Sequence, residues 1–115
     1  MPYFDLFVAA VPTDQREAYT EFCIQSHPMM RDLGATEIVD CWGDDTPPGE
    51  VTSLPMAVKA EDGETVVMGW VVWPDKATRD AGWAKMMNDM PEMEMPFDGK
   101  RMIFGGFTEV LSTRP

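Results

Sequence analysis

The chain has 115 residues, of which 44% are apolar and 25% charged, an ordinary composition for a single globular domain over residues 1–115. Its 20 acidic and 9 basic residues give a formal net charge of −11, which repels phosphate backbones and anionic lipid. We therefore expect no nucleic-acid partner and no membrane partner. The chain has only two cysteines and no basic leader segment, and both features favour a reduced, cytoplasmic protein.

The first third of the chain predicts a strand, a helix and a second strand. Residues 3–11 are rich in aromatic and branched side chains, which is typical of a strand. Residues 13–33 carry apolar side chains at helical spacing, and Gly34 supplies a stop. Pro28 lies inside this pattern and predicts a kink or break in the helix. A second strand follows at residues 35–42.

The rest of the chain predicts two or three strands and one helix. Residues 51–60 are a strand candidate weakened by a proline, and a hairpin signal, Asp62-Gly63, separates them from a strand at 64–73. A helix at residues 75–89 and a last strand at 100–111 complete the order. Strands split by two helices indicate an α+β, ferredoxin-like sandwich, an antiparallel sheet with two helices on one face. That fold needs four strands, so 51–60 is surplus.

Both faces of the predicted sheet are apolar, which suggests a homodimer. Leu6 and Val8 point one way along the first strand, and Phe7 and Ala9 point the other way. Two helices cover only one face of a sheet, and a large apolar face is rarely left in water. The simplest cover is a second copy of the chain. The alternative is that loops and the Met-rich segment fold over this face.

Four segments resemble the YbaA-like family, which comprises small bacterial proteins of unknown function. They are YFDLFVAAVP at the start, IVDCWGDD (38–45), MAVKAEDGE (56–64) and MPFDGKRMIFGGF (95–107). The family is similar to the dimeric α/β-barrel superfamily, in which two ferredoxin-like sheets pack face to face, so the resemblance implies a dimeric α/β barrel. It implies no activity, substrate or catalytic residue. The chain looks shortened between Met90 and Pro96.

Asp5 is the candidate catalytic residue, because a carboxylate between the aromatic residues Tyr3 and Phe7 is a candidate general acid or base. Arg101 lies on the predicted last strand, which neighbours the first in a ferredoxin-like sheet. We expect it to pair with Asp5 or to hold an anionic group. The commoner alternative is a structural ion pair.

Aromatic residues on the strands are candidates for lining a ligand pocket. The expected ligand-binding residues are Tyr3, Phe7, Trp42, Trp70 and Arg101. The commoner alternative is that these aromatic side chains are core or interface anchors.

No metal and no cofactor are expected. His27 is the only histidine, which excludes a His-rich metal site and favours a solvated position at the edge of the helix. Cys23 and Cys41 are expected to be buried small hydrophobes. The methionines at 86, 87, 90, 93 and 95 could bind Cu(I), but packing is the favoured interpretation.

Two functional hypotheses follow. The first is a homodimeric small-molecule-binding protein or minor enzyme of the dimeric α/β-barrel type, and whether it is catalytic stays open. The alternative is a non-catalytic interaction module with an acidic surface and a Met-rich docking segment at 86–95.

Overall fold

The computed structural model describes residues 1–89 and 95–114. The elements in chain order are β1 (Tyr3–Pro12), a 3-10 turn η1 (Thr13–Gln15), α1 (Arg16–Asp32), β2 (Glu37–Trp42), α2 (Leu54–Ala57), β3 (Glu64–Trp73), α3 (Lys76–Asp89) and β4 (Ile103–Thr108). None of the described helices combines the length and the apolar character needed to span a bilayer.

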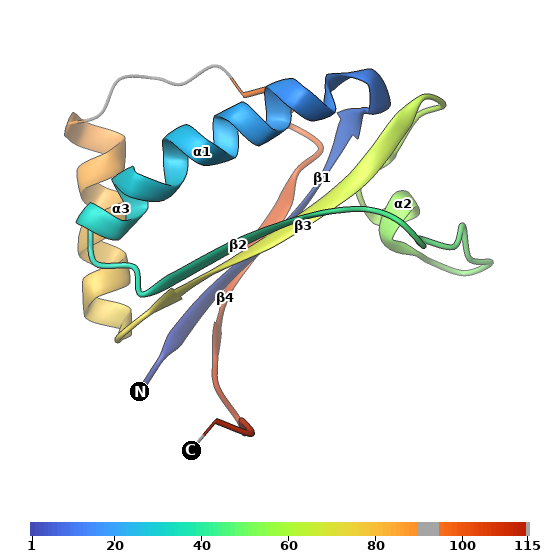
Figure 1. The fold of residues 1–115 in the computed structure, drawn as a ribbon. Helices are drawn as coiled ribbons and strands as arrows, with labels where there is room; N and C mark the ends of the chain where they lie inside the picture. Colours follow the sequence, from blue (N-terminus) through green and yellow to red (C-terminus); the bar gives the residue numbers. More distant parts are fainter. Residues whose placement is uncertain (90–94, 115) are drawn as a thin grey trace.

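The four strands form one antiparallel sheet in the order β2-β3-β1-β4. The long strands β1 and β3 occupy the centre, and the register places Asp5 opposite Val71 on one side and Gly106 on the other. Figure 1 shows α1 and α3 on the same side of this sheet. The chain therefore has the predicted α+β class, and its strand order is compatible with a ferredoxin-like sandwich.

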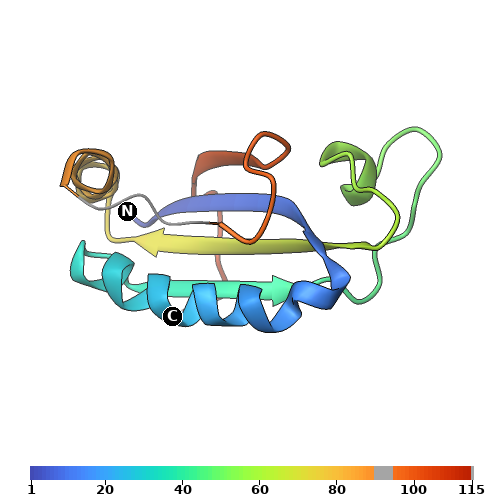
Figure 2. The same ribbon diagram turned by 90° about the horizontal axis from the view of Figure 1, so that it is seen from above.

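Strand alternation divides the side chains between a face that meets the helices and an open face. In β1 the odd-numbered residues point to the helices, so Ala9 and Val11 pack with Tyr19 of α1. Trp73 at the end of β3 points the same way and is fully buried. Figure 2 shows α1 running along the sheet, while α3 is seen end-on at one end. The helix face therefore holds most of the core.

The surplus strand candidate is wrong, because residues 51–60 contain the short helix α2. The Ser53 side chain caps it by accepting the Met56 N–H at 3.0 Å. Pro55 has no N–H to donate to a strand ladder, but it is tolerated in a first helical turn. Val58, directly after α2, is fully buried and covers one end of the open face.

The sequence predicts a kink or a break at Pro28, and the break is wrong, since α1 continues through Pro28 from Arg16 to Asp32. The predicted stop is confirmed. Gly34 has a φ of +114°, a left-handed conformation that favours glycine and ends the helix. The unbroken helix keeps the middle and last turns of α1 over the sheet.

Much of the open face is apolar and lacks a helix to cover it. Leu6, Ile103 and Phe107 on this face are 36%, 43% and 54% exposed. Further half-buried side chains on the same face are Phe4, Val39, Met68 and Trp70. Val58 covers one end of this surface and the Arg114 guanidinium lies 5.9 Å from the centre of the Phe4 ring, but no described helix covers its middle.

Candidate functional site

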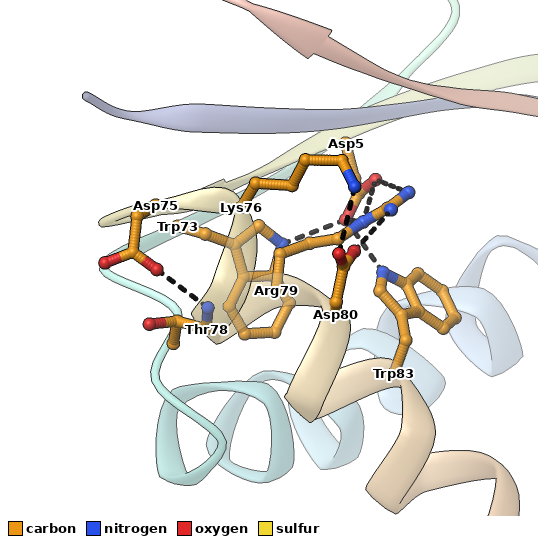
Figure 3. A network of polar contacts seen from close by, with 8 residues as sticks. All are labelled: Asp5, Trp73, Asp75, Lys76, Thr78, Arg79, Asp80 and Trp83. Carbon is orange, nitrogen blue, oxygen red and sulfur yellow. Dashed lines mark hydrogen bonds and ion pairs between the residues drawn. The ribbon is translucent and has the colours of Figure 1, made fainter.

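Asp5 is held by donors from two elements at the end of the sheet near α3 (Figure 3). Its Oδ1 accepts the Nη2–H of Arg79 at 2.8 Å, and its Oδ2 accepts the indole N–H groups of Trp73 and Trp83, both at 2.9 Å. The Arg79 guanidinium also lies 5.2 Å from the centre of the Tyr3 ring. The Asp5 side chain is only 12% exposed, and its charge is balanced by a cation at contact distance.

Local sequence explains why α3 presents these donors. The Asp75 carboxylate accepts the Thr78 N–H at 2.7 Å and so caps the start of α3. Arg79 and Trp83 are four residues apart and therefore lie on one helical face. Gly82 lets the helix approach the sheet, because a Cβ there would lie 3.0 Å from the Trp73 ring.

The predicted pair between Asp5 and Arg101 is not formed. Gly106 of β4 lies opposite Asp5, whereas Arg101 precedes β4 and lies near the other end of β1. Arg101 instead donates to both oxygens of the Glu64 carboxylate at 2.8 Å and to Asp98 at 3.1 Å. These hydrogen bonds from Arg101 connect the turn before β4 to the start of β3.

The Glu64–Arg101 pair predicts an acid-sensitive contribution to stability. Hydrogen bonds from Arg101 lower the pKa of Glu64 from 4.5 to about 2. A lowered folded-state pKa means that the stabilisation is complete above pH 4.5 and is lost as the pH falls toward 2. Glu64→Gln should lower the melting temperature by about 4 °C at pH 7.

The difference in melting temperature between the wild type and Glu64→Gln should shrink steadily as the pH falls from 4.5 to 2. Melting curves recorded by circular dichroism measure it. Glu50→Gln removes one acidic charge from an exposed loop and is the matched control, with no pH-dependent difference expected. A Glu64→Gln deficit that stays constant down to pH 2 would contradict the ion-pair assignment.

A cavity of about 270 Å³ lies between the helices and the sheet. Most of its wall is apolar, and the turn before β4 contributes Met95, Phe97 and Met102. The other lining residues are Asp5, Leu6, Phe7, Phe22, Ser26, Met30, Ile38, Asp40, Trp70, Val71, Trp83 and Phe104. The cavity is thus a mainly hydrophobic space that contains two carboxylates.

Asp40 of β2 is the second carboxylate, and its contacts come from α1. Its Oδ2 lies 2.6 Å from Nε2 of His27, and its Oδ1 accepts the Tyr19 hydroxyl at 3.4 Å. Its side chain is 14% exposed and that of His27 is 33% exposed. Burial, together with the charge of Asp40, raises the pKa of the Cys23 thiol to about 12 and also raises the pKa of Tyr19. Cys23 is therefore a neutral thiol and not an activated nucleophile.

Residues 2–102 match the family described as "Protein of unknown function (DUF1428)". The chain belongs to this DUF1428 family. It is 49% identical over 116 residues to "Uncharacterized protein YbaA" of Escherichia coli strain K12, covering 96% of this chain and 98% of the relative. The YbaA protein of Shigella flexneri matches with the same identity and coverage. The predicted family resemblance is confirmed, and neither the family nor these relatives are described with an activity.

This DUF1428 chain brings only part of the predicted ligand-binding set to the cavity. Phe7 lines it from the helix face, together with Asp5, whereas Trp70 borders the cavity from a strand position whose side chain lies on the open face and donates to Glu37 at 3.3 Å. Tyr3 lies beside Arg79, and Trp42 packs on Tyr19 with ring centres 6.0 Å apart.

The sequence-based prediction missed Arg79, Trp83 and the Asp40–His27 contact. The sequence predicts a solvated position for His27 at the edge of the helix, and its side chain is 33% exposed but lies 2.6 Å from Asp40. The four-residue spacing of Arg79 and Trp83 was a visible signal, although it did not indicate Asp5 as their partner.

The methionines divide between the cavity and the surface of this family member. Met95 lines the cavity, whereas Met87 is exposed. Met90 and Met93 lie outside the described residues. Among the described residues there is no group of three or more His, Cys, Asp or Glu side chains arranged to hold a metal ion.

Proposed function

We propose that this DUF1428 protein binds a small apolar molecule in the cavity between its helices and its sheet. The observation that carries the proposal is the cavity itself, about 270 Å³ in volume and lined mainly by aromatic, aliphatic and methionine side chains. Small-molecule sites are typically mostly apolar hollows of 300 Å³ or more with a few polar groups that set orientation. At about 270 Å³ the cavity lies just below this range, which suits a small ligand of one or two rings.

In this proposal Asp5 holds cavity-lining side chains in place by hydrogen bonds and takes no part in chemistry. Its oxygens already accept bonds from Arg79 and from two indoles, one of which belongs to the cavity-lining Trp83. A carboxylate occupied in this way is a poor acceptor for a substrate proton. The proposal therefore assigns binding and no catalytic residue.

Binding of 1-naphthylmethanol, a neutral two-ring probe, tests the proposal by isothermal titration calorimetry. Met30→Trp places a larger side chain at the cavity wall and should weaken binding at least about tenfold. Met56→Trp makes the same change on α2, away from the cavity, and should bind like the wild type. No binding to the wild type, or equal loss in both variants, would overturn the proposal.

We further propose that a second copy of the chain covers the open face and that the two sheets form a dimeric α/β barrel. The exposed apolar residues on that face support the proposal, because such surfaces on a single protein usually mark interaction sites. A two-fold axis would bring the same patch of each copy together.

Two phenylalanines of β4 give a matched test of the dimer. Phe107 lies on the open face and Phe104 on the helix face, and both are exposed. Phe107→Lys should raise the dimer dissociation constant about 100-fold, because a charge would be buried without a partner. Phe104→Lys should leave it nearly unchanged. Light scattering after size exclusion measures both, and a monomeric wild type would refute the proposal.

A further inference from the structure

The two carboxylates of the cavity differ in how their charge is balanced. Asp5 has the guanidinium of Arg79 at 2.8 Å and two indole donors. Asp40 lines the same cavity, but among the described residues its hydrogen-bonding neighbours include no permanent cation. The cavity wall therefore carries one negative charge at Asp40 whenever His27 is neutral.

The groups around Asp40 do not remove this charge. From α1, the Tyr19 hydroxyl is a weak donor at 3.4 Å, and Tyr19 and Cys23 remain neutral because burial raises both pKa values. From β3, Gly69 faces the carboxylate and brings no charge. His27 is the third neighbour, with Nε2 2.6 Å from Asp40 Oδ2, and its imidazole is not a permanent cation as a guanidinium is.

We propose that the cavity selects a ligand with an ammonium group on an apolar body, and that Asp40 accepts its hydrogen bond. This inference rests on the proposed binding function of the cavity and names its ligand class. An ammonium on a carboxylate in an apolar site forms a charge-assisted hydrogen bond, which is stronger than the bond from a neutral hydroxyl. An anionic ligand would meet the like charge of Asp40 and be rejected.

Three probes with the same naphthalene ring separate charge from shape. They are 1-naphthylmethylamine, 1-naphthylmethanol and 1-naphthoate, titrated calorimetrically into the purified protein at pH 8, where alkylammonium groups remain largely charged. The amine should bind about tenfold more tightly than the alcohol, and the alcohol at least about tenfold more tightly than the carboxylate.

Matched variants assign the preference to Asp40. Asp40→Asn keeps a polar side chain of similar size and should reduce the amine-to-alcohol ratio to about one. Asp44→Asn removes the same charge from an exposed loop nearby and should leave the ratio unchanged. This control matters because the net charge of −11 attracts any cation weakly.

The outcomes separate this inference from the proposed function. Binding of the alcohol without a preference for the amine would overturn the ligand class and leave the cavity as a binding site. An unchanged ratio in Asp40→Asn, or an equal loss in Asp44→Asn, would also overturn the role of Asp40. Binding of none of the three probes would overturn both proposals.

A measurement on the wild type covers the case in which Asp40→Asn fails to fold. The three probes are compared on the unaltered protein at pH 8, where the amine should bind about tenfold more tightly than the alcohol. A wild-type amine-to-alcohol ratio near one would by itself contradict the assignment of Asp40.

Discussion

Asp5→Asn is expected to lower the melting temperature by about 10 °C, which corresponds to a loss of roughly 2–3 kcal/mol. The substitution leaves Arg79, whose side chain is only 22% exposed, without its anion. It also weakens the acceptor of both indole N–H groups. Circular dichroism melting curves at pH 7 measure the effect.

Asp80→Asn is the matched control. Asp80 also bonds Arg79, at 3.1 Å, but its side chain is 48% exposed, and pairs that open to solvent contribute little. A drop of about 2 °C or less is expected for this variant. If Asp5→Asn melted like the wild type, Asp5 would not be the anchor of α3, and its predicted role as an acid or base would regain support.

Gly69→Ala is expected to be about as damaging, with a loss near 3 kcal/mol. A Cβ at this position would lie 2.6 Å from Asp40 Oδ1, 2.6 Å from Phe7 Cε1 and 2.7 Å from the Val39 carbonyl oxygen. The carbonyl belongs to the neighbouring strand and cannot rotate away. The change should therefore lower the melting temperature by about 10 °C and also weaken 1-naphthylmethanol binding, since Phe7 and Asp40 line the cavity.

Gly105→Ala provides the comparison within the same sheet. A Cβ there would lie 3.6 Å from the Phe107 ring, an ordinary contact, and β4 is an edge strand. Alanine should be neutral or slightly stabilising, because glycine loses more chain entropy on folding. Equal melting temperatures for Gly69→Ala and Gly105→Ala would show that the sheet can move aside at Gly69.

The sequence-based prediction was most accurate where one local pattern decides the structure. The strand at 64–73 has the bounds of β3, and the alternation in β1 correctly separated Asp5 and Phe7 from Leu6 and Val8. It was wrong at 51–60, where a capped turn of helix and the buried Val58 replace a strand. Composition alone did not distinguish these outcomes, because short apolar stretches suit either structure.

The candidate site likewise combines features that depend on one segment of the chain with side-chain pairs between distant segments. Sequence by itself determined the family, the α+β class and the face on which each strand residue lies, because these depend on motifs and on periodicity along one segment. Only the tertiary structure decided that Asp5 pairs with Arg79, 74 positions away, and that Arg101 pairs with Glu64. It likewise brought Asp40 to His27. A charged side chain can pair with any opposite charge that the fold brings near, so helix placement and strand register select its partner.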